Sequence, residues 1–184
     1  MPEVRDFAPK RGRSGEINIL GKDLDAVGNP QLAFESSAGS AVSDARPVNP
    51  QHLKAQIPSL NDATYALTLR GNNFKQLLGG FTVGPPQVGL VLNCTFPDQV
   101  KSSGGDVLYI LGNGFREGGR GDSPAVLFNG TASRTGATKD NSLIVVASVP
   151  TADEAGAMPG DTIEVKVTFS DQQSVIGRVT YTSS

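Results

Sequence analysis

The sequence repeats an ordered set of short apolar segments, and this repeat limits the possible folds more than any other feature. Segments of the first half return in the second half in the same order, about 90 residues later. The matched pairs are Phe7-Ala8-Pro9 with Phe96-Pro97, 17–21 with 108–112, 32–34 with 126–128, 53–58 with 144–150, and 65–69 with 163–167. We therefore expect two modules of one architecture, over residues 1–84 and 86–184.

The repeated segments have the length and the pattern of β-strands. In residues 163–169 every second side chain is apolar, which is typical of a strand with one face in a core and the other in water. Asn129-Gly130 follows an apolar run and predicts a two-residue hairpin turn. Only residues 152–157 could make a helical turn. Other strand-like segments occupy residues 16–20, 65–69, 107–111 and 143–146.

The composition agrees with an all-β fold. The chain of 184 residues contains 22 glycines and 12 prolines, which favour many turns over long helices. Tryptophan is absent and only 6% of residues are aromatic, so we expect cores built mostly from aliphatic side chains. Gly84-Pro85-Pro86 would join the two modules through a short, semi-rigid linker, because proline restricts the backbone.

The second half carries a series of turn motifs at characteristic places between its strands. These motifs are Phe96-Pro97, Gly112-Asn113-Gly114-Phe115, Phe128-Asn129-Gly130 and Val149-Pro150. Over most of residues 88–182 the series resembles the IPT/TIG domain family, and the first half resembles it more loosely. The resemblance implies two tandem immunoglobulin-like β-sandwiches. It also implies a family common in binding and surface proteins, although such a fold fixes no single function.

Charge and hydropathy argue against several classes of partner. Sixteen basic and eighteen acidic residues give a formal net charge of −2, which disfavours nucleic-acid binding, including DNA binding in the manner of Rel-type factors. No stretch approaches the roughly 18 apolar residues of a membrane span, so no membrane insertion is expected. The N-terminal residues lack the apolar core of a classical secretory signal, which favours cytoplasmic synthesis.

The two most reactive residue types in the chain, histidine and cysteine, occur where structural roles are expected. His52 and Cys94 are the only histidine and cysteine, so neither a disulfide within the chain nor a Cys/His zinc site can form. His52 lies where a turn leads into a strand, without a second histidine, and Cys94 lies in an apolar strand without a nearby base. We therefore expect no catalytic residues, no cofactor and no enzymatic activity.

Other short motifs are equally weak as ligand sites. Asp23, Asp25 and Asn29 offer oxygen ligands but lack the bidentate glutamate of a calcium loop, so no metal site is expected. The glycine-rich turns lack the lysine and hydroxyl residue of a phosphate loop. Two glycosylation sequons, at Asn93 and Asn129, are interpreted as chance matches.

One motif suggests cell attachment. Arg120, Gly121 and Asp122 lie in a glycine-flanked segment between two expected strands and resemble the attachment loop of fibronectin-type adhesion proteins. Such a loop could project a guanidinium and a carboxylate toward an integrin-type receptor. If the motif has this function, Asp122→Glu should reduce adhesion of integrin-bearing cells.

The N-terminus concentrates basic charge. Arg5, Lys10, Arg11 and Arg13 lie within thirteen residues of an otherwise acidic chain. This segment is either a docking arm for an acidic partner or a solvated, frayed leader.

The leading hypothesis is a non-enzymatic structural or interaction protein, a projecting module of a larger assembly. That assembly would be a virion, with the module as capsid decoration or tail component, or a surface appendage. Its partners would be proteins, with a homo-oligomer as one form of the assembly. The alternative is an adhesion module that binds cells through Arg120-Gly121-Asp122 or glycans through a sandwich face. Few aromatic side chains are available for stacking on sugars, and Tyr65 and Tyr109 lie in expected strands.

Overall fold

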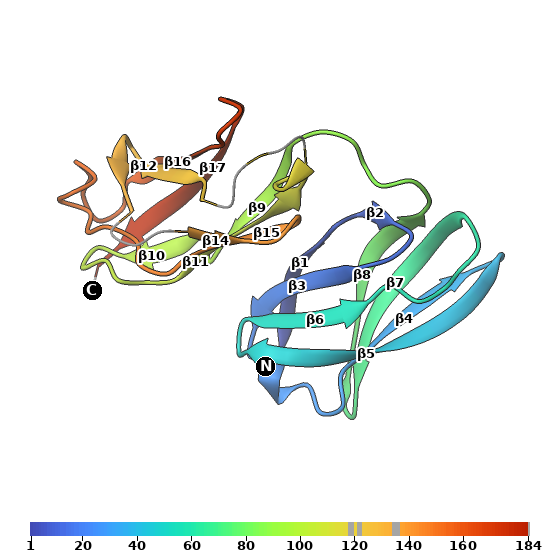
Figure 1. The fold of residues 1–184 in the computed structure, drawn as a ribbon. Helices are drawn as coiled ribbons and strands as arrows, with labels where there is room; N and C mark the ends of the chain where they lie inside the picture. Colours follow the sequence, from blue (N-terminus) through green and yellow to red (C-terminus); the bar gives the residue numbers. More distant parts are fainter. Residues whose placement is uncertain (118–119, 121–122, 134–136, 184) are drawn as a thin grey trace. The chain divides into compact units, whose positions relative to one another are not determined.

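The computed structural model describes residues 1–117, 120, 123–133 and 137–183. The chain forms two compact units, Met1–Val88 and Gly89–Ser184, both built from β-strands (Figure 1). A short 3-10 helix, η1, spans Leu24–Ala26. Residues 152–157 form turns, and Gly156 adopts a positive φ of 61°, which a continuing helix excludes. The expected all-β fold is confirmed.

The N-terminal unit is a sheet folded over on itself. Its strands are β1 (Glu3–Ala8), β2 (Arg11–Gly12), β3 (Glu16–Lys22), β4 (Gln31–Ser36), β5 (Gly39–Asn49), β6 (His52–Gln56), β7 (Ala63–Gly71) and β8 (Phe74–Val83). They follow the order β1-β3-β6-β5-β4-β7-β8-β2. The long strand β5 belongs to both layers, because its first half pairs with β4 and its second half with β6. Side chains from both layers, such as Ile19 and Leu67, meet in one core.

The C-terminal unit is a sandwich of two sheets. Its strands are β9 (Val91–Phe96), β10 (Gln99–Lys101), β11 (Leu108–Asn113), β12 (Ala125–Phe128), β13 (Thr131–Ala132), β14 (Ala137–Lys139), β15 (Leu143–Val146), β16 (Thr162–Thr168) and β17 (Ser174–Thr182). One sheet has the order β10-β17-β16-β12-β13 and the other β14-β15-β11-β9. Asn129 and Gly130 form the expected hairpin turn between β12 and β13, with φ angles of 48° and 90°.

The two units share one strand arrangement. In each, the first strand pairs with the third, and the short second strand runs parallel to the last: β2 with β8, and β10 with β17. The matched sequence segments lie on equivalent strands, β3 and β11, β4 and β12, β6 and β15, β7 and β16. This order is that of an immunoglobulin-type sandwich. The strands of the two units therefore correspond in order and pairing.

The aromatic side chains are concentrated in the two cores. All three tyrosines and seven of the eight phenylalanines are buried. The Tyr65 hydroxyl donates a hydrogen bond to the Asn61 carbonyl at 3.0 Å, the tyrosine-corner contact of immunoglobulin-type folds. In the C-terminal unit the Tyr181 hydroxyl donates to the Pro150 carbonyl at 2.9 Å. The expected core role of Tyr65 and Tyr109 is confirmed.

The buried Tyr181 hydroxyl makes the C-terminal unit sensitive to alkali. Burial, with a smaller effect from the charge of Glu154, raises the pKa of Tyr181 from 10.0 to about 12. Above pH 10 the tyrosine ionises in the unfolded chain but stays neutral in the folded unit, so ionisation favours unfolding. The contribution of this group to stability should be complete below pH 10 and decline between pH 10 and 12.

The test is a set of urea denaturation curves between about pH 9 and 12 for the wild type and Tyr181→Phe. Below pH 10 the variant should be less stable than the wild type, because the Pro150 carbonyl loses its donor. Its stability should depend less on pH above 10. Equal pH dependence of the two proteins would contradict the prediction.

Candidate interaction faces

His52 and Cys94, the two candidates for catalysis, both lie on β-strands. His52 is the first residue of β6; it is buried, and its Nε2 atom is hydrogen-bonded to the Asn18 Oδ1 atom at 2.8 Å. Cys94 is half-buried and lies on β9, the edge strand of its sheet. Among the described residues, no group of three or more acidic, histidine or cysteine side chains could hold a metal ion. The Asp23 carboxylate lies 3.1 Å from the N-terminal ammonium of Met1.

Arg120 does not project from the surface as the attachment hypothesis requires. Its residue exposure is 8%, and its Nε atom lies 2.7 Å from a carboxylate oxygen of Asp171. Its two terminal nitrogens donate to the Gly114 carbonyl at 2.6 Å and to Gln173 Oε1 at 2.8 Å. The guanidinium thus ties its own loop to the β16–β17 connection. Gly121 and Asp122 lie outside the described residues.

The basic N-terminal residues do not form a separate arm. Arg5 lies on β1 and Arg11 on β2, and both strands are paired within the N-terminal unit. Lys10 forms an ion pair with Asp6, and its ammonium lies 3.4 Å from the centre of the Phe7 ring.

Arg13 is also engaged within the unit. Its Nε atom donates to Asp62 at 3.1 Å, and this hydrogen bond lowers the pKa of the Asp62 carboxyl. Backbone pairing and local ion pairs hold this segment on the fold, so it is not a frayed leader. Docking of these residues on an acidic partner stays a prediction.

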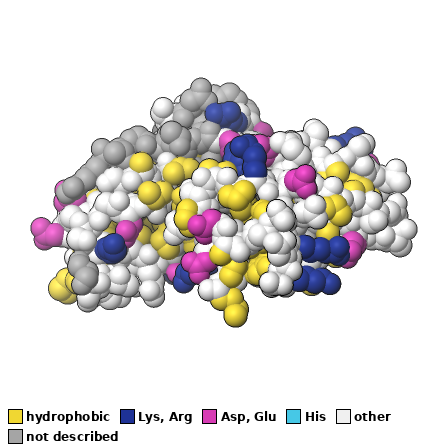
Figure 2. Space-filling model, turned by 90° about the horizontal axis from the view of Figure 1, so that it is seen from below, with side chains coloured by type: hydrophobic (Ala, Val, Ile, Leu, Met, Phe, Trp, Pro, Cys, Tyr) yellow, Lys and Arg dark blue, Asp and Glu magenta, His cyan; other side chains and the backbone are white. Residues whose placement is uncertain are grey.

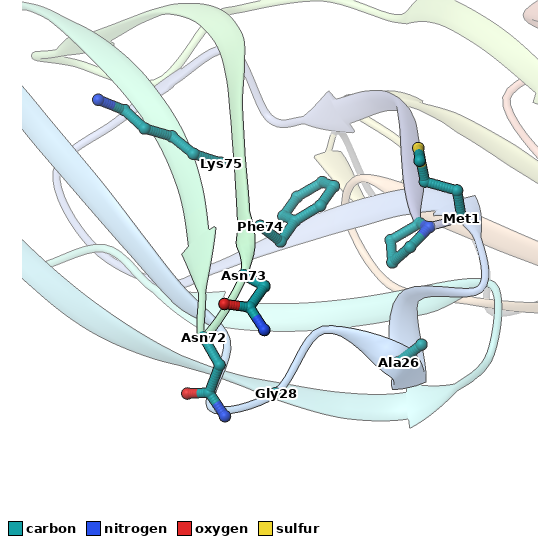
Figure 3. Close-up of a pocket in the computed structure, with 8 residues that line it drawn as sticks. Met1, Ala26, Gly28, Asn72, Asn73, Phe74 and Lys75 are labelled. Atoms are coloured by element: carbon teal, nitrogen blue, oxygen red, sulfur yellow. The ribbon is translucent and has the colours of Figure 1, made fainter.

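One open depression of about 530 Å³ lies at an end of the N-terminal unit (Figure 3). Its lining residues are Met1, Pro2, Ala26, Gly28, Asn72, Asn73, Phe74 and Lys75. This lining has no carboxylate side chain, histidine or cysteine, and Lys75 carries its one ionisable side chain. Asn72 is engaged with Asn29 by a hydrogen bond of 3.2 Å between their side chains.

The outer face of β5-β4-β7-β8, here called the N-face, carries exposed aliphatic side chains. Its middle row is formed by the cross-strand neighbours Val42, Ala33, Thr68 and Leu77. Val42 is 55% exposed and Leu77 is 66% exposed. Leu77 points outward because the pairing of β7 with β8 contains a bulge beside Leu78, whose own side chain packs against the core.

The outer face of β13-β12-β16-β17, here called the C-face, repeats this row. Cross-strand neighbours there are Ala132, Leu127, Lys166 and Ile176. Ile176 is 53% exposed and occupies the position on the last strand that Leu77 has in the N-face. Both units therefore expose a large aliphatic side chain at the same point of the same sheet. Sequence reasoning missed both residues.

The charges on the surface are mixed. On the side of the molecule shown in Figure 2, acidic and basic side chains are interspersed with apolar ones, and no field of one sign forms among the coloured atoms. This pattern agrees with the net charge of −2 and offers no basic stripe on that side. Within the described ranges, no helix combines the length and the apolar character needed to cross a membrane.

Comparisons with known proteins agree with this architecture. The IPT/TIG domain family matches residues 91–183. The biofilm-associated protein BSP domain is similar with a TM-score of 0.54 and 13% identity, over 98% of this chain and 30% of that chain. Domains 5–6 of the S-layer protein SbsC match with a TM-score of 0.42 and 9% identity, over 100% of both chains. The extracellular region of plexin A4 matches with a TM-score of 0.37 and 10% identity, over 98% of this chain and 27% of that chain.

The matched family indicates no enzymatic class. The chain spans less than a third of the length of the biofilm and plexin chains, and at 13% identity the likeness to the biofilm-associated domain shows the fold alone. No curated protein matches the sequence significantly. The family match covers half of the chain and falls on the unit whose two sheets have the immunoglobulin order, so the chain belongs to the IPT/TIG domain family.

Proposed function

We propose that this chain is a non-enzymatic interaction module that docks into a larger protein assembly, a surface appendage or a virion, through the N-face and the C-face. The observation that carries the proposal is the exposed aliphatic side chain that both units hold at the same position, Leu77 and Ile176. The printed names of similar structures include a biofilm-associated protein and an S-layer protein, which agrees with a surface assembly.

The two faces suit protein contacts on physical grounds. Removing an exposed leucine or isoleucine side chain from water contributes about 1–2 kcal/mol, so each face gains from being covered. Ala33 lies between the two aliphatic residues of the N-face, and Ala66 lies beside their row. A flat sheet face can pack against another sheet about 10 Å away.

Two alternatives are less well supported. Attachment through the Arg120 motif requires an exposed guanidinium, whereas this side chain is buried in contact with Asp171. Glycan binding on a sandwich face requires exposed aromatic rings, whereas all three tyrosines and seven of the eight phenylalanines are buried.

The test is recovery of the protein with particles or cell envelopes from its native source. Wild-type protein should sediment with them, and Leu77→Arg and Ile176→Arg should each reduce the sedimented fraction several-fold. Met158→Arg and Val48→Arg are matched controls, because these exposed side chains lie outside the two aliphatic rows. Wild-type protein that remains wholly in the soluble fraction would overturn the proposal.

A further inference from the structure

We propose that the N-face binds the N-face of a second copy of this chain, related by a two-fold axis parallel to the strands. This inference rests on the proposed function, because it names the partner of one docking face. The evidence is the distribution of charge around the exposed aliphatic residues.

The row next to the aliphatic one is positive at one end and negative at the other. Its cross-strand neighbours are Lys75 on β8, Arg70 on β7, Gln31 on β4 and Asp44 on β5. Lys75 and Asp44 are both exposed, and the Asp44 carboxylate accepts a hydrogen bond from Gln31 at 3.0 Å. The positive edge and the negative edge therefore lie on opposite sides of the N-face.

The centre of the N-face is occupied by an ion pair that crosses the aliphatic row. Arg70 and Glu35 lie in the rows on either side of it, so their contact passes over Thr68 and Ala33. Thr68 and Ala33 face outward yet are only 5% and 1% exposed, as expected if this pair covers them. Val42 and Leu77 remain uncovered on the two sides of the pair.

A two-fold axis parallel to the strands brings opposite features together. It places the β8 side of one copy over the β5 side of the other, so Lys75 faces the partner's Asp44 and Leu77 faces the partner's Val42. Because the contact is isologous, each pairing occurs twice. A two-fold axis perpendicular to the strands would instead place Lys75 over the partner's Gly80 and Asp44 over the partner's Ser40. Neither charge would then face an opposite charge.

The size of the face limits the strength of the contact. Four strands about 4.8 Å apart and about 20 Å long present about 400 Å² of sheet. Protruding side chains add to this area, so two such faces bury about 1,000 Å² in total. This is the lower limit for a specific interface. We therefore expect a dissociation constant on the order of 10⁻⁵ to 10⁻⁴ M, with weaker association at high salt.

Charge reversal tests the pairing directly. Sedimentation equilibrium of the full chain would be measured for the wild type, Lys75→Glu, Asp44→Lys, the double variant, and an equimolar mixture of the two single variants. Each single variant places like charges opposite each other twice, so its self-association should weaken at least tenfold. The double variant and the mixture restore opposite charges at both contacts and should associate again, the mixture as a one-to-one heterodimer.

Two controls keep the result interpretable. Lys22→Glu reverses an exposed lysine on β3, outside the N-face, and should associate like the wild type. Thermal unfolding of each variant checks that its fold is intact, which is expected because the altered side chains are exposed.

Wild-type protein that stays monomeric at millimolar concentration would overturn the inference, and so would association that neither single reversal weakens. A monomeric wild type that still sediments with particles or envelopes would overturn only this inference and leave the proposed function standing.

Discussion

Replacement of Arg120 by alanine is expected to lower the free energy of unfolding of the C-terminal unit by about 3 kcal/mol. The side chain of Arg120 is 6% exposed, and it contacts a carboxylate, a backbone carbonyl and a side-chain amide oxygen. Its removal leaves these acceptors without their cationic donor. The expected cost is at the lower end of that for a broken buried ion pair, because the Asp171 side chain is 25% exposed and can recover some solvation.

Lysine at this position should recover only part of the loss. Lys keeps the charge, but it has no planar fork to reach Gly114, Asp171 and Gln173 together. The matched control is Arg178→Ala, which removes an exposed arginine from β17 and should change stability by less than about 0.5 kcal/mol. Urea denaturation of the three variants measures the effect, and equal stability of Arg120→Ala and Arg178→Ala would contradict the prediction.

This effect also decides how the attachment motif should be tested. Arg120→Ala would remove the contacts of this side chain with Asp171 and Gln173, and the resulting loss of stability could reduce adhesion even if no receptor binds the motif. A conservative change at Asp122 is therefore the informative one.

The positions of several strands and one hairpin could be predicted because alternation and turn chemistry are local signals. The motif Asn129-Gly130 requires no distant contact to favour a hairpin, and the alternating residues 163–169 define an inner face by themselves. Because the segments recur in the same order, a strand predicted in one half also predicts the matching strand in the other half. The same repeat extends to cross-strand pairs that sequence reasoning did not use: Thr64 with Thr82 at 3.1 Å and Thr162 with Thr180 at 2.8 Å between hydroxyl oxygens.

The exposed aliphatic rows of the N-face and the C-face could not be predicted, because the pairing of distant strands decides which side chains face water. Leu77 and Leu78 are adjacent leucines, and only the bulge opposite β7 makes the first face water and the second the core. Arg120 stands among glycines, which suggested an exposed loop. Its burial depends on Asp171 and Gln173, about fifty residues further along the chain.

The second large effect concerns two glycines at equivalent positions, Gly21 and Gly112. Each lies on the third strand of its repeat, where the first strand approaches closely beside a bulge. A Cβ atom on Gly21 would lie 2.0 Å from the Glu3 carbonyl oxygen, and one on Gly112 would lie 2.1 Å from that of Val91. Both obstacles are backbone atoms, so the first strand itself would have to move.

Gly21→Ala should therefore destabilise the N-terminal unit, and Gly112→Ala the C-terminal unit, each by about 3 kcal/mol, the upper end of the usual cost of overpacking. Gly80→Ala is the matched control, because a Cβ there meets only a Thr64 methyl group at 3.5 Å and the φ angle is ordinary. That change should be neutral or slightly stabilising, since alanine restricts the unfolded chain. Urea titration followed by NMR signals of each unit measures both effects separately. Loss of stability in the Gly80 variant comparable to that in the other two would show that crowding against the first strand is not the reason for glycine at these positions.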